Sequence, residues 1–338
     1  MTTARSDGTP GRTQGPPLGL LACLALVLGP LNGCGKAEKE PSGRRKVAAI
    51  LMVQDQFFRL NEFGMKDAAK RLDVELLTSV ADGKPDKEIS LIDTYIERGV
   101  DAILISPFNA VGSIDALKRA SDKGIRIIAY NVSIDKGFES ANIESSQFEL
   151  GASTGKAFAQ YVRDKLGGKA KIALIGFVSN LPEQGGARLN GFKSALKDLP
   201  GVAVVAEQDA WEAGRAATVV ESVLLAHPDI DVVWAANEGG TVGAVTAVKS
   251  AGKAGKVVVF GTDMSEQLAD FLLADDSVLQ AITGQKPFEM GSLAVETAVK
   301  ILSGQPVEKK VLLPGILFTR QKPDEVRAYK QRLVELAK

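Results

Sequence analysis

From Lys46 onward, the chain alternates short apolar runs with longer segments of mixed character. The runs are strand-sized and read "KVAAILMV", "VELLTSV", "DAILISP", "IRIIAYN", "KIALIGF", "VAVVAEQ", "DVVWAAN", "KVVVFGTD" and "VLQAITG". Because apolar residues are continuous along these runs and do not alternate with polar ones, the strands should be covered on both faces. This pattern predicts parallel sheets.

The segments between the runs carry apolar residues three and four positions apart, which predicts helices with one buried face. They read "FFRLNEFGMKDAAKRL", "DKEISLIDTYIERG", "VGSIDALKRASDKG", "FELGASTGKAFAQYVRDKLGG", "ARLNGFKSALKDLPG" and "RAATVVESVLLAHPD". Repeated strand and helix units of this kind predict an α/β fold with doubly wound, right-handed crossovers.

The two halves of the chain resemble each other. "RGVDAILISP" followed by "KGIRIIAYN" corresponds to "PDIDVVWAAN" followed by "GKVVVFGTD", so we predict two similar lobes. The paired strands end in Ser106 and Asn131 in the first half, and in Asn237 and Asp263 in the second. Since ligands of open α/β sheets bind at the carboxyl ends of strands, we expect a small-molecule site in a cleft between the lobes.

Charge and length narrow the class of protein. The 338-residue chain has 41 basic and 41 acidic residues. It therefore lacks the positive excess that holds a nucleic acid or an anionic membrane surface, and we expect no nucleic-acid partner. The length allows each lobe a core of its own.

The N-terminal segment has the pattern of a targeting signal. "LGLLACLALVLGPL" matches the apolar region of a signal peptide and is short for a membrane span. "LNGCGKAEKE" then places Gly33 before Cys34 and resembles the lipobox of bacterial lipoproteins. The resemblance implies that residues 1–33 are a lipoprotein signal peptide and that Cys34 is lipidated. Plain secretion is the alternative, because Asn32 is larger and more polar than the residue usually found there.

Removal of residues 1–33 would take Cys23 away, so the mature chain would have no thiol pair for a disulfide or metal site. Residues 34–45 include "GKAEKEPSGRR", a charged stretch with Pro and Gly. Such a composition is typical of a flexible tether. We expect it to link a membrane anchor to a folded body on the periplasmic or extracellular side.

No catalytic motif stands out. His227, the only histidine, precedes Pro228 at a predicted helix end, where helix capping is a simpler role than catalysis. HExxH and CxxC are absent from the sequence, and no GxSxG nucleophile elbow is predicted, because "GASTG" at 151–155 lies inside a predicted helix and not at a strand-to-helix turn. "GASTGKA" at 151–157 departs from the spacing of a phosphate loop, and we interpret its glycines as helix-packing residues. We therefore predict no enzymatic activity, no cofactor and no metal.

Polar and aromatic residues near the predicted strand ends are of the kinds that bind carbohydrates. Asp, Asn and Gln pair with vicinal hydroxyls, and aromatic faces cover the C–H faces of a sugar ring. The candidates are Gln54, Asp55, Gln56, Phe57, Phe58, Ser106, Asn131, Trp211, Asn237, Asp263 and Gln285.

Between about Lys46 and Val311, the chain resembles the ribose-binding family of periplasmic receptors, the type I solute-binding proteins of ABC sugar transporters. The resemblance rests on "FGMKDAAKRL", "GVDAILISP", "AHPDIDVVWAANEGGTVGAVTAVKSAGK", "VVVFGTD" and "AITGQKPFEMGSLAVETAVKILSG". It implies two Rossmann-like lobes joined by a three-stranded hinge near Ser145, Gln285 and Leu313. The N-terminal lobe would then comprise 46–144 and 286–313, and the C-terminal lobe 145–285 and 314–338.

The same resemblance implies roles for single residues. Phe57 and Phe58 would stack on the sugar, and Trp211 would close the other ring face. Asn237, Asp263 and Gln285 would hold the ligand by hydrogen bonds. Asn131 and Ser106 stand where ribose and galactose receptors usually have aspartate and asparagine, so the first lobe should bond its ligand differently.

A larger departure lies in "NLPEQGGARLNGF". The family's ligand-clasping arginine falls at Gly186, while Arg188, at the second arginine position, serves either the ligand or the fold. Glu183 or Gln184 are the candidates to replace the lost contacts. Without the bidentate arginine clamp, we expect a hexose, cyclic polyol or nucleoside in preference to ribose.

These implications give two functional hypotheses. The first is a monomeric substrate-binding lipoprotein of an ABC importer, which closes around a sugar or polyol by hinge motion and docks on permease subunits. The alternative is a receptor that reports a sugar, nucleoside or autoinducer-like signal to a sensor kinase or chemoreceptor.

Overall fold

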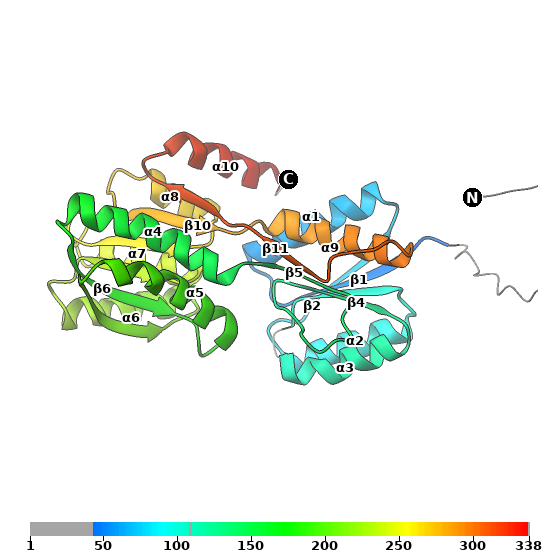
Figure 1. Ribbon diagram of the computed structural model, residues 1–338. Coiled ribbons are helices and arrows are strands. Elements are labelled where there is room, and N and C mark those ends of the chain that lie inside the picture. The colour runs from blue at the N-terminus through cyan, green and yellow to red at the C-terminus, as the bar shows by residue number, and fades with distance from the viewer. Residues whose placement is uncertain (1–42, 108–109, 337–338) are drawn as a thin grey trace, which may run out of the picture. The chain divides into compact units, whose positions relative to one another are not determined.

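The strands form two six-stranded sheets (Figure 1). The computed structural model describes residues 43–107 and 110–336. The predicted signal peptide, Cys34 and most of the predicted tether lie outside the described residues. Among the helices of the described residues, none is long and apolar enough to cross a membrane.

The first sheet has the strand order β11-β5-β4-β3-β1-β2, with every neighbouring pair parallel. Its strands are β1 (Lys46–Leu51), β2 (Glu75–Val80), β3 (Ala102–Ile105), β4 (Arg126–Tyr130), β5 (Ala141–Ser145) and β11 (Lys310–Leu313). The second sheet has the order β12-β10-β9-β8-β6-β7, and only β12 runs antiparallel to its neighbour. Its strands are β6 (Lys169–Gly176), β7 (Gly201–Asp209), β8 (Val232–Ala235), β9 (Val258–Thr262), β10 (Leu279–Gly284) and β12 (Ile316–Thr319).

The two orders are equivalent position by position, which confirms the predicted two-lobed α/β fold. β3 and β4 occupy the places that β8 and β9 occupy in the second sheet. These are the strands in which the sequence repeats itself. The resemblance between the halves therefore reflects a repeated architecture.

Helices cover both faces of each sheet. They are α1 (Gln56–Arg71), α2 (Pro85–Glu97), α3 (Ala110–Asp122), α4 (Gln147–Lys165), α5 (Pro182–Ser194), the 3-10 turn η1 (Ala195–Asp198), α6 (Ala213–Ala226), α7 (Glu238–Ser250), α8 (Glu266–Leu273), α9 (Pro287–Leu302) and α10 (Pro323–Leu336). In Figure 1, α1 and α9 lie above the first sheet and α2 and α3 lie below it. Neighbouring residues of one strand face opposite layers: Val47 packs with α1 and α9, while Ala48 packs with α2 and α3.

Burial follows position in the sheet. β3, β8, β9 and β10 are buried at every residue, as their continuous apolar runs predict. The edge strands β2 and β7 are only partly buried, because each has a neighbour on one side alone. A continuous apolar run therefore predicts the strand but not its place at an edge.

Three strands were not among the predicted apolar runs: β5, β11 and β12. β5 reads "ANIES" and contains the buried Asn142, whose side chain accepts from Ile134 N at 2.8 Å and donates to Ile134 O at 3.1 Å. The other two have four residues each. Their pairing partners are distant in sequence, so local periodicity gives little signal for them.

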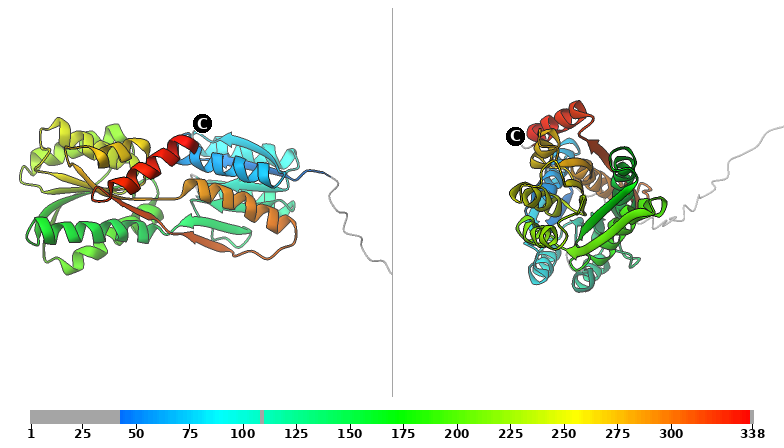
Figure 2. Two further views of the ribbon diagram at one scale, coloured as in Figure 1. Left: turned by 90° about the horizontal axis from the view of Figure 1, so that it is seen from above. Right: turned by 90° about the vertical axis from the view of Figure 1, so that its left-hand side faces the viewer.

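The chain passes three times from one sheet to the other. β5 ends at Ser145 before α4 begins, β10 ends at Gly284 before α9 begins, and β11 ends at Leu313 before β12 begins. In the left view of Figure 2, seen from above, the last passage is the brown segment that runs from one sheet to the other. Three short connections of this kind are the covalent basis for a hinge.

The glycines of "GASTGKA" pack helix against helix, which confirms their interpretation from sequence. A Cβ at Gly151 would lie 1.9 Å from the carbonyl oxygen of Arg188, and one at Gly155 would lie 2.9 Å from that of Phe192. α4 and α5 therefore approach each other backbone to backbone. This close approach fixes where α5 presents Arg188.

Candidate functional site

A cavity of about 370 Å³ lies at the carboxyl ends of strands from both sheets. Its walls combine carboxylates, amides and aromatic rings. It is lined by Met52, Asp55, Gln56, Phe57, Phe58, Asn131, Phe177, Leu181, Gln184, Arg188, Trp211, Glu212, Ala213, Asn237, Glu238, Gly239, Val242, Asp263, Met264, Gln267, Gln285 and Pro287. Its size suits a monosaccharide-sized ligand.

The cavity brings together most of the residues singled out from sequence. Those that line it are Asp55, Gln56, Phe57, Phe58, Asn131, Gln184, Arg188, Trp211, Asn237, Asp263 and Gln285. Gln54, Ser106 and Glu183 do not line it. Ser106 is fully buried, and its hydroxyl accepts a hydrogen bond from Asn131 Nδ2 at 3.2 Å. It can act on a ligand only through Asn131.

Glu183 faces a different cavity, of about 640 Å³. Pro182 and Glu183 form the start of α5, and Gln184 one residue later lies in the wall that the two cavities share. Successive side chains on a helix point in different directions, so Gln184 reaches the first cavity and Glu183 does not, although they are adjacent in sequence. Of the two substitutes for the missing arginine, only Gln184 lines the first cavity.

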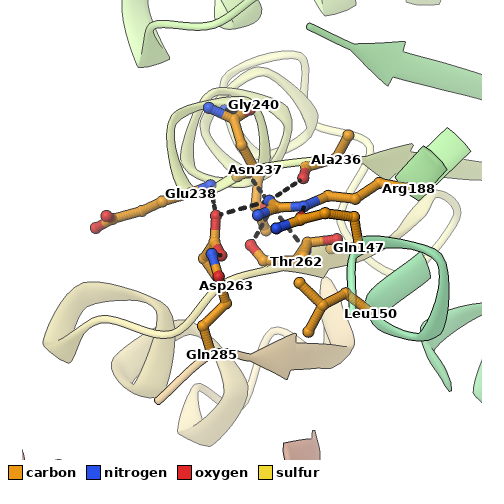
Figure 3. A network of polar contacts seen from close by, with 12 residues as sticks. Gln147, Leu150, Arg188, Ala236, Asn237, Glu238, Gly240, Thr262, Asp263 and Gln285 are labelled. Carbon is orange, nitrogen blue, oxygen red and sulfur yellow. Dashed lines mark hydrogen bonds and ion pairs between the residues drawn. The ribbon is translucent and has the colours of Figure 1, made fainter. Parts of the chain in front are cut away.

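Asp263 is the centre of the polar network in the second lobe (Figure 3). Its Oδ1 accepts from Gln285 Nε2 at 2.8 Å, and its Oδ2 accepts from Glu238 N at 3.1 Å and from Arg188 Nη1 at 3.3 Å. Asp263 follows β9 with φ of 71°, a left-handed conformation that Asp tolerates better than most residues. This conformation turns the carboxylate from the strand end toward three donors.

Arg188 is a buried side chain whose groups are largely committed to the protein. It is 3% exposed, and its Nε donates to Gln147 Oε1 at 2.7 Å while Nη1 donates to Ala236 O at 2.8 Å. Its guanidinium also lies over the Phe177 ring, 5.3 Å from the centroid. Arg188 therefore fixes the cavity wall, and this arrangement favours the structural role over a free ligand clamp.

Asn237 also has internal partners at both ends of its amide. As the N-cap of α7, its Oδ1 accepts from Gly240 N at 3.1 Å, and its Nδ2 donates to Trp211 O at 2.9 Å. An amide has two donors and two acceptor positions. Asn237 thus keeps one of each for a ligand while anchoring Trp211.

Aromatic rings meet the cavity from both lobes. Phe57 and Phe58 lie in the first turn of α1, edge to face, with centroids 5.2 Å apart. Phe177 and Trp211 form a similar pair in the other lobe, also 5.2 Å apart. Phe58 is 3% exposed and packs on Tyr130, so Phe57 offers more of its surface to a ligand.

Asn131 connects the lobes through its backbone. Its carbonyl oxygen accepts from Gln184 Nε2 at 2.6 Å, and both residues line the cavity. Like Asp263, Asn131 follows its strand with a positive φ, 62°. Its side chain bonds Ser106 and thereby faces the fold as much as the cavity.

Two carboxyl groups of the cavity have raised pKa values. Burial, opposed by a hydrogen bond with Ser265 and reinforced by the negative charges of Asp263 and Asp55, raises the pKa of Glu238 to about 7. Desolvation also raises the pKa of Asp55, against the hydrogen bond that its Oδ1 accepts from Phe58 N. Asp55 lines the cavity and remains accessible to solvent.

Some cavity residues were not among the sequence candidates, chiefly Glu238, Glu212 and Phe177. Glu238 directly follows the candidate Asn237, and Phe177 directly follows β6. Both positions follow a strand end, the signal that selected the other candidates. Glu212, before α6, had no such signal, since its strand β7 ends at Asp209.

Residues 49–306 match the family model described as periplasmic binding protein domain. The chain belongs to the periplasmic binding protein family. The resemblance seen in the sequence is thereby confirmed, and its members bind solutes. Among relatives of this periplasmic binding protein is the ABC transporter periplasmic-binding protein YphF of Escherichia coli (strain K12), 32% identical over 89% of this chain and 92% of that protein. The ribose import binding protein RbsB of Bacillus subtilis (strain 168) is 29% identical over 88% and 97%.

Solved structures extend these similarities. An ABC transporter periplasmic solute binding protein from Actinobacillus succinogenes 130z with bound D-allose is 26% identical, with a TM-score of 0.77 over 83% of this chain and 100% of that one. A solute binding protein from Bacillus halodurans C-125 with bound myo-inositol shares the fold, with a TM-score of 0.78 at 24% identity over 87% and 99%.

Proposed function

We propose that this periplasmic binding protein is the substrate-binding component of an ABC importer, and that it binds a sugar or sugar-like polyol between its lobes. The relatives named as ABC transporter and ribose import binding proteins support transport over sensing. The solved relative with bound D-allose supports a sugar-sized ligand. Neither the family nor the cavity chemistry calls for turnover, so we infer binding without catalysis.

The observation that carries this proposal is a cavity lined by residues of both lobes beside a passage between them. Asp55 and Asn131 follow strands of the first sheet, Asp263 follows β9 of the second, and Gln285 lies between β10 and α9. A ligand that contacts both sides binds the closed arrangement better than the open one and so shifts the population toward closure. We propose that the moving lobes are 46–144 with 286–313 and 145–285 with 314–338.

The first experiment is thermal unfolding of the protein from Lys46 onward with pentoses, hexoses, inositols, nucleosides and amino acids. A micromolar ligand at a thousandfold excess over Kd contributes about 4 kcal/mol to the free energy of unfolding, which raises Tm by several degrees. We expect a shift with one sugar or polyol. A shift with nucleosides alone would replace the proposed ligand class, and a flat panel would contradict the proposal.

The proposed location rests on Cys34. We propose that Cys34 is lipidated and that the folded body, held on the outer side of a membrane, docks on permease subunits when loaded. Expression in a bacterial host should give a membrane-bound protein whose intact mass exceeds that of residues 34–338 by the mass of the lipid. Cys34→Ala should abolish both the membrane binding and the added mass. Retention of wild-type protein in the soluble fraction with unmodified mass would instead establish plain secretion.

A further inference from the structure

The cavity carries an excess of negative charge. Of its lining residues, Asp55, Glu212, Glu238 and Asp263 are acidic, whereas Arg188 is the only basic one. The hydroxyl groups of a neutral sugar both donate and accept hydrogen bonds, and amide side chains satisfy both needs without adding charge, whereas ionised carboxylates only accept. The acidic walls therefore indicate that the ligand has a further polar group besides its hydroxyl groups.

Arg188 offsets only part of this charge. Its Nη1 bonds Asp263 Oδ2 and Ala236 O, and its Nε bonds Gln147 Oε1. Asp263 is the most fully bonded carboxylate in the cavity, with three donors around it. Within residues 43–107 and 110–336, no arginine or lysine bonds the carboxylate of Asp55 or Glu238; Asp55 accepts from Phe58 N, and Glu238 has a hydrogen bond with Ser265.

Asp55 and Glu238 come from opposite lobes, at the first turns of α1 and α7. The charge of Asp55 raises the pKa of Glu238, and that of Asp263 raises the pKa of both. Arg59 acts on both in the opposite direction, as a smaller contribution. Closing two lobes that carry like charges costs electrostatic free energy unless a cation lies between them.

Gln285 supplies an independent observation. It lines the cavity at a passage between the lobes and is 5% exposed, and its Nε2 donates to Asp263. Its Oε1 has no hydrogen-bond partner among the described residues. A buried acceptor without a donor is costly, so we expect closure of the lobes around a ligand to bring a donor to this oxygen.

We propose that the ligand is an amino sugar or amino polyol, in which a protonated amine replaces one hydroxyl and lies between Asp55 and Glu238. The inference rests on the proposed function and narrows its ligand class. An ammonium group has three donors and no acceptor, which suits walls rich in acceptors. Its positive charge also reduces the repulsion between the two carboxylates, so the closed form should bind the charged ligand more tightly than the open form.

A bare metal ion fits these walls less well than an organic cation. Among the described residues, no group of three or more His, Cys, Asp or Glu side chains is arranged to hold a metal. Glu238 extends its carboxyl group away from the Asp263 network (Figure 3). The carboxylates are thus distributed around a ring-sized space that also contains aromatic surfaces.

The test is calorimetric titration with matched pairs at pH 7. Each pair consists of a sugar or inositol and its amino-deoxy counterpart, for example glucose with glucosamine and myo-inositol with an aminodeoxyinositol. The N-acetyl derivative is the uncharged control for size. We expect at least one amine to bind about tenfold or more tightly than its hydroxyl partner and its acetylated form.

Variants identify the carboxylates responsible. Asp55→Asn and Glu238→Gln keep side-chain size, and Asn remains a good N-cap for α1. Each variant should bring the ratio of the two Kd values, hydroxyl compound over amine, close to one. Glu97→Gln, at an exposed residue of α2, should leave the preference unchanged. Thermal unfolding without ligand checks that each variant is folded.

Three results would overturn the inference. Equal binding within every pair, with a neutral sugar bound, would leave the proposed function standing and remove the amine. Tighter binding of calcium than of any amine would assign the charge to a metal. Absence of binding by every member of every pair would contradict this inference and, with a flat thermal panel, the proposed function as well.

Discussion

The two lobes share one architecture but differ in how their strand ends are bonded. Asn131 and Asp263 follow equivalent strands, both with positive φ, and the backbone N–H of each donates to a neighbouring strand, at Ile143 O and Thr283 O. The Asn131 side chain has one bond, to Ser106, whereas the Asp263 carboxylate has three donors. The repeated fold sets the positions, and the residue types make the second lobe the more preorganised half of the site.

Packing of helices repeats in the same way. In the first lobe, a Cβ at Gly64 would lie 1.9 Å from Phe288 O, and one at Gly291 would lie 2.0 Å from Asn61 O. In the second lobe, a Cβ at Gly151 would lie 1.9 Å from Arg188 O. Of these contacts, only the one at Gly151 fixes a helix that carries a buried charged residue of the cavity.

Removal of the Asp263 carboxylate should have the largest effect. Asp263→Ala leaves Arg188 and Gln285 without their shared acceptor, and truncating such a buried charged partner costs about 2–5 kcal/mol. We expect ligand affinity, measured by calorimetry, to fall about 100-fold or more. Asn131→Ala should cost only about tenfold, since one hydrogen bond is lost.

Asp263→Asn serves as the control for backbone strain, because Asn tolerates positive φ as Asp does. It should retain the fold and still lose affinity. If Asn131→Ala and Asp263→Ala weaken binding equally, the proposed asymmetry between the lobes is wrong.

Alanine at the close-approach glycines should separate stability from binding. Gly64→Ala and Gly151→Ala both overpack a helix pair and should lower the free energy of unfolding by about 1–3 kcal/mol. Only Gly151→Ala should also weaken ligand binding, because it displaces α5 and Arg188. Gly186→Ala, on the same helix with nothing within 4 Å of the added Cβ, should leave the free energy of unfolding nearly unchanged.

The raised pKa of Glu238 predicts that this carboxyl group contributes to the pH dependence of stability. Its pKa is about 7 in the folded protein against 4.5 as the ordinary value. The folded state therefore binds the proton more tightly, and the free energy of unfolding should fall as pH rises from about 4.5 to 7. Denaturant titrations should show a shallower fall in Glu238→Gln and greater stability than wild type above pH 7. An identical slope would show that other groups, such as Asp55, cause the dependence.

The smallest effect should come from Ser106→Ala. It removes the hydroxyl that accepts from Asn131 Nδ2, worth about 0.5–1.5 kcal/mol of stability. Ligand affinity should change only severalfold, because Ser106 acts through Asn131. A loss as large as that of Asp263→Ala would mean that the first lobe depends on this bond as strongly as the second depends on its network.

Part of the site follows from sequence by a simple rule. Residues just after apolar runs lie at strand ends, and this placed Asn131 and Asp263 at the cavity together with Asn237. The rule misplaced Ser106, which the first sheet buries, and it did not reach Glu212, which lies directly before α6 and away from a predicted strand end. Gln184 and Glu183 could not be told apart, since one residue along a helix turns the side chain toward another cavity.

The sequence by itself determined the sheets, their doubly wound connections and the repetition of the lobes, because these depend on local apolar periodicity and on a pattern used twice. The tertiary structure alone decided which strands lie at the edges and that β5, β11 and β12 exist. It also decided that Arg188 is committed to Gln147, Ala236 and Asp263, and that carboxylates of two lobes share one cavity. Those features depend on residues far apart in the chain, whose charges and hydrogen bonds meet only after folding.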